Sequence, residues 1–423
     1  MLSSLKRLLG PRHPLRLGWH RLKAFLAALR YGFPARHLIV VGITGTDGKT
    51  TTVGMLAHIL QHSGWRTGSL STAYIHIDQK NEWNTTQKTS PSPFVIQRFL
   101  RRVANAGCTH AVLEYSSHGL VQGRTLFTWP RVAAITNTAM EHLDYHGTME
   151  QYRNDKAILF RMLGGRGAKI LNADDETYET YTDIPSAITI DYSPTRQLKN
   201  VHSEPRKCHA TAVIDGQEYD LRLAIPGTFN LENALCAIGC AQALGLHPQR
   251  AITALESFHG TPGRMERIDE GQNFSVFIDF AITPQAFEKT LTTIRQMVGD
   301  AHRVIVLTGS CGDRMKEKRP IIGKLCSERA DVVVITDDES YAEDPTKVME
   351  EVWAGVDQTQ TEAYKIFDRC EAMSKALSVA KPGDAVVLCG LGSYPSRMTP
   401  NGPVPWNEQE MTRQLLRELQ NNE

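Results

Sequence analysis

Apolar residues recur along the chain in two alternating patterns, short continuous runs and longer stretches with a period of about 3.6 residues. The short runs predict strands at 38–41, 111–114, 132–136 and 169–171, and the periodic stretches predict helices at 94–106 and 149–163. Such alternation is typical of a mainly parallel sheet with helices on both faces. Because ligands of such sheets bind at the carboxyl ends of the strands, the residues that follow these strands are candidates for chemistry.

The pattern becomes short and β-like at 187–190, 210–214 and 219–225, and a helix is predicted at 231–244. A Gly/Pro-rich stretch at 259–264 indicates an interdomain hinge. Beyond it, strands at 275–279, 303–307, 332–336 and 385–388 predict a second, Rossmann-like α/β unit. A chain of 423 residues is too long for one ordinary core, so we expect three parts: an N-terminal segment 1–37, a central domain 38–262 and a C-terminal domain 263–423.

Charge is unevenly placed in residues 1–37, which hold eight basic residues and no acid, although the whole chain carries only +1. The basic residues are Lys6, Arg7, Arg12, Arg16, Arg21, Lys23, Arg30 and Arg36. Leu15, Trp19, Leu22, Leu26 and Leu29 recur at helical spacing and predict a basic amphipathic helix. Two interpretations are open: peripheral attachment to anionic lipid or to a partner, or an apolar stripe that covers the protein's own body, which we favour.

Composition narrows the class of protein. Hydrophobic content of 41% and 22% charged residues are those of a soluble globular protein. No apolar stretch approaches the length that spans a bilayer, and basic residues within 1–37 argue against a secretory signal. The eight cysteines form no C-x-x-C pair, which argues against a zinc site and fits reduced thiols in a cytoplasm.

A phosphate-binding loop is predicted at residues 42–52, Gly-Ile-Thr-Gly-Thr-Asp-Gly-Lys-Thr-Thr-Thr, which follow one predicted strand and precede a helical pattern. Lys49 can reach the β- and γ-phosphates, the Thr50 hydroxyl can bind Mg²⁺, and glycines let backbone N–H groups face the phosphates. The spacing departs from the general pattern, whose first glycine falls on Ile43. The loop predicts binding and cleavage of ATP or a relative, through Gly45, Thr46, Asp47, Gly48, Lys49, Thr50 and Thr51.

Two neighbouring strand ends carry an acid and histidines. The strand at 111–114 ends in Glu114 and is followed by Ser-Ser-His-Gly at 116–119. The strand at 132–136 is followed by Asn137 and then by Glu-His-Leu-Asp-Tyr-His-Gly at 141–147. An acid and histidines beside a phosphate loop predict Mg²⁺ ligands around a triphosphate, although a histidine near a turn is more often structural.

Together these segments resemble the Mur ligases, above all the members that add the third amino acid of the peptidoglycan stem peptide. The matches run in order from about 38 to 412 and lie at 45–50, 114–118, 137, 142–147, 156, 227–233, 263–266, 312–314 and 318–320. The resemblance implies a cytoplasmic, ADP-forming amide ligase of cell-wall precursor synthesis. In that reaction a substrate carboxylate attacks the γ-phosphate to give an acyl phosphate, which an amine then attacks.

The resemblance also implies a role for each matching residue. Lys49 and Thr50 would hold the phosphates and one Mg²⁺ with Glu114, while His142 would bind a second Mg²⁺. Lys156 matches the lysine that the family carbamylates, since a neutral lysine can take up CO₂ and the anionic product can steady the second metal; an ordinary solvated lysine is the alternative. Nucleotide contacts, between the two domains, would come from Asn137, Asn233, Arg264 and Asp279. Donor contacts would come from Thr89, Ser90, Ser116, Gln122 and Arg124.

The chain departs from the family pattern at five places. It shows no counterpart of the family's N-terminal uridine-binding domain, Glu141 replaces an aspartate, and Ile282 replaces a histidine. The Asp-Asn-Pro-Arg signature that reads meso-diaminopimelate is Asp-Glu-Ser-Tyr at 338–341, and Gly-Lys-Gly-His-Glu is Gly-Leu-Gly-Ser-Tyr at 390–394. With Asp338 and Tyr341 at the amino-acid pocket, we expect meso-diaminopimelate to be a poor substrate.

Three hypotheses follow. The first is a ligase that joins an amino acid to a muramoyl-peptide-like donor, with small molecules and no nucleic acid as partners. The second is a ligase acting on another acid, as folylpolyglutamate synthetase does. The third is a degenerate nucleotide-binding paralogue with a regulatory or scaffold role, which the changes at 282, 391 and 394 favour and the intact loop opposes.

Overall fold

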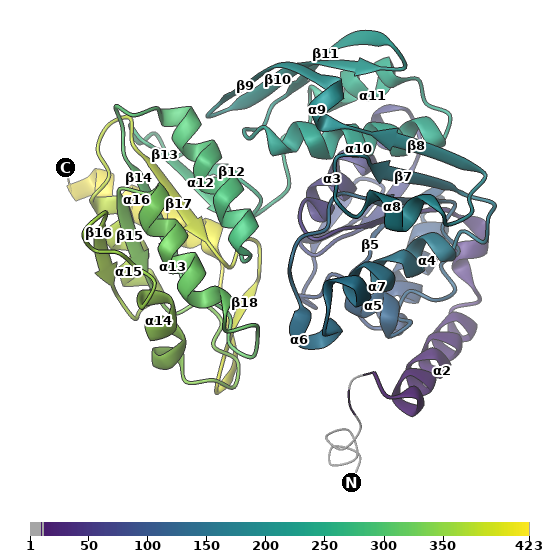
Figure 1. The fold of residues 1–423 in the computed structure, drawn as a ribbon, viewed down its shortest axis with the longest axis horizontal. Helices are drawn as coiled ribbons and strands as arrows, with labels where there is room; N and C mark the ends of the chain where they lie inside the picture. Colours follow the sequence, from purple (N-terminus) through teal and green to yellow (C-terminus); the bar gives the residue numbers. More distant parts are fainter. Residues whose placement is uncertain (1–9, 11, 423) are drawn as a thin grey trace. The chain divides into compact units, whose positions relative to one another are not determined.

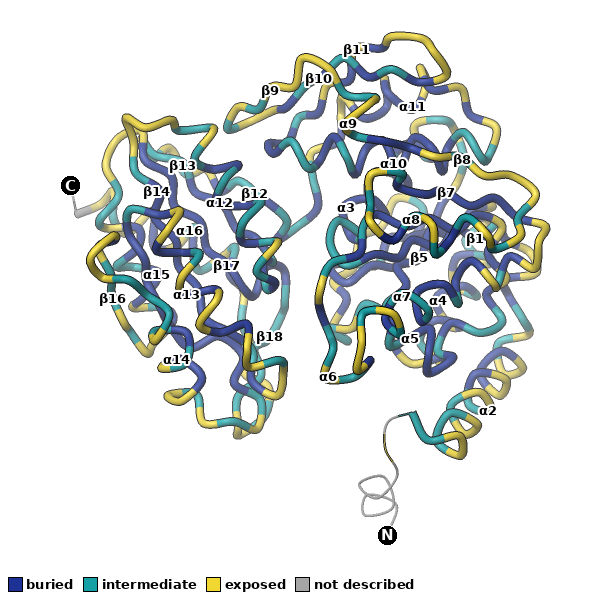
Figure 2. Tube along the Cα trace, in the orientation of Figure 1, coloured by how far each residue is buried: buried dark blue, intermediate teal, exposed yellow. Residues whose placement is uncertain are grey.

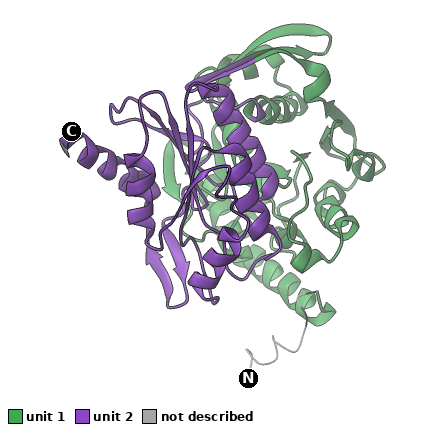
Figure 3. Cartoon of the chain, turned by 60° about the vertical axis from the view of Figure 1, so that its left-hand side comes forward, with its two compact units in different colours: residues 1–201, 210–223, 230–258 green, residues 202–209, 224–229, 259–423 purple. Residues whose placement is uncertain are grey.

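The computed structural model describes residues 10 and 12–422, whose elements are labelled in Figure 1. Lys6 and Arg7 of the basic segment lie outside the described residues. The chain separates into two compact units, coloured in Figure 3: unit 1 comprises residues up to 201, 210–223 and 230–258, and unit 2 comprises 202–209, 224–229 and 259 onward. The boundaries at 37/38 and 262/263 stay predictions.

Unit 1 is built on an eight-stranded sheet in the order β4-β3-β2-β5-β1-β6-β7-β8. The six strands from β2 to β8 in this order run parallel, as predicted, whereas β3 and β4 extend one edge as antiparallel strands that the pattern did not reveal. The strands are β1 Ile39–Thr44, β2 Thr67–Leu70, β3 Tyr74–Ile77, β4 Lys80–Trp83, β5 His110–Glu114, β6 Val132–Ile135, β7 Ala168–Asn172 and β8 Ile188–Tyr192.

Helices cover the sheet of unit 1. α4 and α7, both predicted, bury apolar residues such as Phe99 and Phe160 against β1 and β5 in one core. Proline at the first helical position begins α4, since its missing N–H needs no partner there. The helices are α2 Pro14–Arg30, α3 Lys49–His62, α4 Pro93–Asn105, α5 Ser117–Val121, α6 Leu143–His146, α7 Met149–Arg161, α8 Tyr178–Thr182, α9 Pro194–Gln197, α10 Phe229–Ala243 and α11 Pro248–Leu255, with a 3₁₀ turn η1 at Pro34–His37.

The helix predicted in the basic segment is α2, but the favoured placement of its apolar stripe is wrong. α2 packs against α4 through Ala24, Ala27 and Ala28, which are fully buried. The stripe residues point the other way, and Leu15 and Leu29 remain 71% and 56% exposed. Alanine has no long side chain, so this face lets two helices approach closely, and that contact decides which face is buried. Within the described residues no helix is long and apolar enough to cross a membrane.

A small three-stranded sheet, which we call the meander, has the order β11-β10-β9 and lies between the two large sheets in the chain. Its strands are β9 Leu198–Glu204, β10 Lys207–Ile214 and β11 Gln217–Leu223, and α11 packs on β11. Buried and exposed residues alternate along β10, as expected for a strand with one face in a core. The β-like stretch at 210–225 was therefore predicted correctly, whereas β9 was not recognised.

Unit 2 is a doubly wound sheet in the order β12-β13-β17-β14-β15-β16, parallel except for β12. Two apolar cores cover its two faces, one holding Phe287 of α12 and the other Met373 of α15, which confirms the Rossmann-like prediction. The strands are β12 Glu266–Ile268, β13 Ser275–Asp279, β14 Val304–Thr308, β15 Val332–Ile335, β16 Glu362–Lys365 and β17 Ala385–Cys389, with a hairpin of β18 Ser396–Thr399 and β19 Gly402–Pro405. The helices are α12 Pro284–Val298, α13 Lys318–Arg329, α14 Pro345–Trp353, α15 Arg369–Ser378 and α16 Glu408–Asn422.

A buried arginine ties α13 to the segment around α14. The Arg319 side chain is fully buried and donates hydrogen bonds to Glu343, Glu351 and the Cys311 carbonyl. Its hydrogen bonds lower the pKa of Glu343 to about 2, outweighing burial, which by itself would raise it. The Lys-Arg-Pro segment that carries part of the family resemblance therefore has a structural role at Arg319.

Replacing Arg319 by methionine is expected to lower the free energy of unfolding by about 3 kcal/mol, because Glu343 and Glu351 lose the buried guanidinium that joins them, while Lys316 still pairs with Glu343. In the wild type, the contribution of the Arg319–Glu343 pair to the free energy of unfolding is fully present above the usual glutamate pKa of 4.5. It is lost as the pH falls towards 2, where Glu343 becomes protonated. The difference in the free energy of unfolding between the variant and the wild type should therefore become smaller below about pH 4. Denaturant unfolding at several pH values measures this.

Arg329→Met, at the end of the same helix, is the matched control. Arg329 pairs with Glu288 with both side chains largely exposed, so its loss should cost less than about 1 kcal/mol. Equal losses in the two variants would contradict the assignment of a structural role to the buried network.

Candidate active site

The predicted phosphate loop lies between β1 and α3, at the centre of the large sheet of unit 1. Gly45 and Gly48 both have positive φ, and a Cβ on either would fall within about 2 Å of Thr136 or Asn233. Glycine is thus required at both positions by backbone conformation and by close contacts. The Lys49 ammonium donates to the Thr46 carbonyl across 2.6 Å, so this side chain folds back over the loop.

The end of β6 holds the loop in place. Asn137 accepts from the Asp47 N–H at 3.0 Å, and its carbonyl accepts from the Thr46 N–H at 2.8 Å. Thr136 donates to the Asp47 carbonyl at 2.6 Å. Asn137, predicted at the nucleotide site, therefore shapes the loop. Asn233 of α10 adjoins Gly48 of the loop. A residue that contacts a nucleotide bound at the loop, as predicted for Asn233, would have to lie there.

Glu114 reaches the loop from the neighbouring strand β5. Its Oε2 accepts hydrogen bonds from the Thr50 hydroxyl at 3.0 Å, and from the N–H and hydroxyl of Thr72 at 2.6 and 2.9 Å. Strand register explains the approach, because Glu114 pairs with Ile43 of β1 just before the loop. Two candidate metal ligands, Thr50 and Glu114, are thus in direct contact.

The candidate donor-binding residues gather around the end of β5, and each already has a partner inside unit 1. Thr89 accepts from Thr72, and the Ser90 hydroxyl accepts from the Ser116 N–H. Ser116 also caps α5 through the Gly119 N–H. The Ser116–Gly119 contact is local capping of a helix, whereas the other two contacts join residues distant in the chain.

Arg124 and Gln122 form a second part of this group. The Arg124 guanidinium donates to Gln122 Oε1 at 2.6 and 3.0 Å and to the Ser90 carbonyl at 2.8 Å. Burial lowers the pKa of Arg124, as expected for a cation without a carboxylate partner at hydrogen-bond distance. A guanidinium held in this way by neutral acceptors retains its charge for an anionic ligand.

Lys156 of α7 is completely buried beneath the loop. Its Nζ donates to the Gly45 carbonyl at 2.7 Å and lies 4.3 Å from the centre of the Tyr152 ring. Burial, assisted by the nearby positive Lys49, lowers the pKa of Lys156 well below its usual value. The solvated-lysine alternative is therefore wrong, and a neutral amine is favoured at this position.

His142 lies among aromatic rings that connect it to the loop. Its ring stands perpendicular to His118 with centroids 4.7 Å apart, and His118 lies 5.1 Å from His146. His146 contacts the Tyr152 ring, whose hydroxyl lies 3.2 Å from Thr46 Oγ1. Lys49, Glu114 and Lys156 thus meet at the loop itself, and His142 is connected to it through these rings.

Sequence reasoning missed the polar chain beneath these rings. Arg12 donates two hydrogen bonds to Asp155 at 2.6 and 2.9 Å. Asp155 pairs with His146, which contacts the Ser117 hydroxyl at 3.0 Å. Arg12 and Asp155 are separated by 143 residues, and no sequence pattern signals such a pair.

Four predicted site residues belong to unit 2. Asp279, at the end of β13, is buried and accepts from the Met265 N–H at 2.8 Å, and burial raises its pKa although Arg264 opposes this. The Arg264 guanidinium lies 4.1 Å from the centre of the Phe280 ring. Burial also raises the pKa of Asp338 to about 6, while the Tyr341 hydroxyl donates to Glu339 at 3.4 Å.

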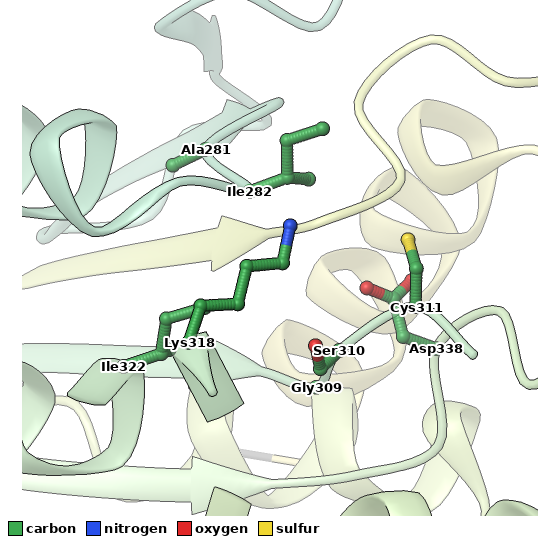
Figure 4. Close-up of a pocket in the computed structure, with 8 residues that line it drawn as sticks. All are labelled: Ala281, Ile282, Gly309, Ser310, Cys311, Lys318, Ile322 and Asp338. Atoms are coloured by element: carbon green, nitrogen blue, oxygen red, sulfur yellow. The ribbon is translucent and has the colours of Figure 1, made fainter. Parts of the chain in front are cut away.

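A small hollow of about 10 Å³ in unit 2 is lined in part by Asp338, as Figure 4 shows. Ile282, where the chain departs from the family pattern, and Asp338, the unchanged first residue of the altered segment 338–341, line the hollow, and the Lys318 ammonium points towards it. Gly390 touches Asp338, since a Cβ there would lie 2.3 Å from Asp338 Oδ2. The altered segments 338–341 and 390–394 therefore meet at one place, as the sequence predicted.

The residues at the loop fit a magnesium–nucleotide complex. Thr50 and Glu114 supply a hydroxyl and a carboxylate oxygen in contact, which are ligands that Mg²⁺ prefers. Asp47 Oδ2 is buried and has no hydrogen-bond partner, so the loop contains an unsatisfied acceptor beside Lys49. Among the described residues, no three His, Cys, Asp or Glu side chains gather into a metal-holding group.

Comparisons with known proteins agree with the geometry. Residues 43–241 match the Mur ligase middle domain, and residues 263–392 match the Mur ligase, glutamate ligase domain. The chain is 36% identical to the UDP-N-acetylmuramyl-tripeptide synthetase of Roseiflexus sp. (strain RS-1), over 93% of this chain and 81% of that protein.

Two solved structures illustrate the fold. A UDP-N-acetylmuramoyl-L-alanyl-D-glutamate–2,6-diaminopimelate ligase is 26% identical with a TM-score of 0.62, covering 90% of this chain and 79% of its own. The folylpolyglutamate synthase of Mycobacterium tuberculosis is 17% identical with a TM-score of 0.71, covering 94% of both chains, and shows likeness of fold alone. With both family domains matched in order and a relative at this level of identity, the chain belongs to the Mur ligases.

Proposed function

We propose that this chain is an ATP- and Mg²⁺-dependent ligase that joins an amino acid to the carboxylate of a muramoyl-peptide-like donor through an acyl phosphate. The observation that carries the proposal is the meeting of Lys49, Thr50, Glu114 and Lys156 around one phosphate loop. Its substrates are small molecules of peptidoglycan precursor synthesis, and their chemistry favours a cytoplasmic reaction.

Each loop residue has a distinct task in this proposal. The glycines and the start of α3 direct N–H groups at the phosphates, and Lys49 follows negative charge as it develops on the γ-phosphate. Thr50 and Glu114 would hold one Mg²⁺, and His142 a second one. The ions would supply charge neutralisation between the phosphates and the donor carboxylate. Arg124 is suited to bind an anionic part of the donor.

Lys156 is proposed to act as its carbamate. A neutral amine adds CO₂ to give an N-carboxylate and one proton, and the lowered pKa of Lys156 supplies the neutral amine. The product is longer and anionic, so it would extend from α7 towards the second metal and fix its position. The Gly45 carbonyl, now 2.7 Å from Nζ, would remain an acceptor for the carbamate N–H.

Phosphate release tests the proposal. The full chain is assayed with ATP, Mg²⁺, a panel of amino acids and three kinds of acid: UDP-N-acetylmuramoyl-dipeptide, the same muramoyl-dipeptide without UDP, and a folate. Release that requires both a muramoyl-dipeptide and an amino acid is expected. Release only with folate would favour the second hypothesis, and nucleotide binding without turnover in any combination would favour the degenerate paralogue.

meso-Diaminopimelate is expected to be used at least about 10²-fold less efficiently, in kcat/KM, than the best amino acid of the panel. Tyr341 stands where the arginine fork would bind the distal carboxylate, and Asp338 and Glu339 add buried acids nearby. Leaving a charged group buried without a partner costs about 3–5 kcal/mol. Product formation measured by mass spectrometry checks the ratio.

Tyr341→Arg supplies the control. It returns a guanidinium to this position and should reduce the difference in kcat/KM between meso-diaminopimelate and the best amino acid. Val404→Arg, at an exposed site on β19, should leave this difference unchanged. Efficient incorporation of meso-diaminopimelate by the unaltered chain would overturn the specificity prediction and leave the ligase reaction in place.

A further inference from the structure

The outward face of α2 is a rigidly held apolar surface that unit 1 does not cover. It consists of Leu15, Trp19, Leu22, Leu26 and Leu29, between 43% and 71% exposed, and we call it the α2 face. α2 is fixed at both ends: Arg12 pairs with Asp155, and Arg101 donates to the carbonyls of Tyr31 and Gly32. Figure 2 shows exposed residues along this helix, which lies at the edge of unit 1.

An aromatic cluster continues the α2 face onto the neighbouring loops. Phe25 of α2 lies 5.9 Å from Phe127, and Phe127 and Phe33 each lie 6.0 Å from Trp129, ring centre to ring centre. Trp129 and Phe25 are 40% and 41% exposed. The apolar surface is therefore broader than a single helical seam, and contiguous exposed apolar surface of this kind marks an interaction site.

Basic residues border the α2 face. Arg16, Lys23 and Arg30 each follow a face residue by one position and so form a row along one edge of it. The Lys23 ammonium lies 5.2 Å from the Trp19 ring centre, and Arg36 lies 5.3 Å from that of Trp129. Since residues 1–37 contain no acid, α2 contributes only positive charge to this surface. Its partner must therefore be apolar and negatively charged.

A second copy of this chain does not meet that condition. The face residues alternate by four and three positions, as in a coiled-coil seam, but the flanking positions that would carry complementary charges hold Arg16, Lys23 and Arg30. Two antiparallel helices would place like charges together, and two parallel helices would set these cations against Gly18 and Phe25, which offer no complementary charge. A breadth that includes Phe33, Phe127 and Trp129 also exceeds the narrow seam that one partner helix covers.

We propose that the α2 face docks onto an anionic lipid surface, with its leucines and aromatic rings at the boundary of head groups and acyl chains. Trp19 and Trp129 suit that boundary because an indole ring combines apolar area with a polar N–H. Arg16, Lys23 and Arg30 bury their stems beside the face and keep their charges at the head groups.

Sedimentation of the full chain with vesicles tests the proposal. Binding is expected to phosphatidylcholine vesicles that contain phosphatidylglycerol, weakly or not at all to phosphatidylcholine alone, and to weaken with salt. Arg16→Gln/Lys23→Gln/Arg30→Gln should lower the partition coefficient about 10²-fold, at roughly fivefold per charge. Leu22→Ser/Leu26→Ser should lower it at least about tenfold. Ile188→Ser, an equally exposed apolar site on β8, should leave it unchanged.

Four outcomes would overturn the proposal: no sedimentation with anionic vesicles, equal binding to neutral ones, binding unaffected by either multiple variant, or equal loss in Ile188→Ser. A dimer in light scattering that Leu22→Ser/Leu26→Ser dissolves would assign the face to a second copy. Capture by an acidic helical peptide without vesicle binding would assign it to a protein. Melting curves and ligation of soluble substrates, unchanged in all variants, show that the chain remains folded.

Discussion

Lys49→Ala is expected to abolish ATP-dependent ligation, with kcat reduced by at least about 10³-fold while unit 1 stays folded. Lys49 is the only charged side chain within Gly48–Thr52, and its ammonium lies over the loop at 2.6 Å from the Thr46 carbonyl. A cation placed where charge develops typically contributes about 10²–10³ in rate, and this one also holds the ground-state phosphates. Release of phosphate in single-turnover and steady-state assays measures the loss.

Lys199→Ala is the control for this experiment. Lys199 is exposed and pairs with Glu218 on the surface of the meander, so its removal should change neither turnover nor melting temperature. Lys49→Ala should also keep the wild-type melting temperature without nucleotide, because its hydrogen bond is partly exposed. Turnover within about tenfold of wild type would remove the proposed role of Lys49.

The loop and its neighbours could be predicted because their signals are local. A strand, two glycines and Gly-Lys-Thr lie within a dozen residues, and the sheet then brings Glu114 and Asn137 to the same edge. The family resemblance added Lys156, and the structure supplies the physical reason for it in burial beneath Gly45. Roles in catalysis stay predictions for all of these residues.

Other features could not be predicted, since they depend on contacts between distant segments. Strands β2, β3 and β4 are only four residues long each, and β2, Thr67–Leu70, contains neither alternation nor a β-branched run. The periodicity of α2 located its apolar stripe but could not show that Ala24, Ala27 and Ala28 would make the contact with α4. The Arg12–Asp155 pair likewise requires the folded chain.

For unit 2, the sequence showed where the chain departs from the family pattern, but it could not show what these departures change in the folded protein. Ile282 and Asp338 line one hollow, and Gly390 contacts Asp338, so the changed position 282 and the altered segments 338–341 and 390–394, which begin with these two unchanged residues, meet at a single place. Burial raises the pKa of Glu339 to about 7, with the charge of Asp338 adding to the effect. One buried acid with a raised pKa, Asp338, thus lines the hollow and a second, Glu339, follows it in the chain, which is poorly suited to binding another carboxylate.

Lys156→Met is expected to lower kcat by about 10²–10³-fold with little change in the KM for ATP. Methionine keeps most of the buried volume but cannot form a carbamate, so the variant tests the chemistry of the amine more than the packing. In the wild type, activity should fall when CO₂ is removed and return with bicarbonate, because the modification is reversible. The variant should show no response to bicarbonate.

Two further measurements separate a carbamate from a merely structural lysine. Carbon-13 NMR with labelled CO₂ should show a carbamate signal that Lys156→Met removes, while Lys169 serves as an internal comparison. Lys169 is also buried with a lowered pKa, but its Nζ donates to the carbonyls of Tyr181, Thr182 and Ile184, which leaves no position for CO₂. Lys156→Glu, which supplies a carboxylate on a shorter chain, should recover part of the lost activity without bicarbonate. A wild-type enzyme indifferent to CO₂, with no labelled signal, would assign Lys156 to holding the Gly45 carbonyl and would leave the second metal without its proposed support.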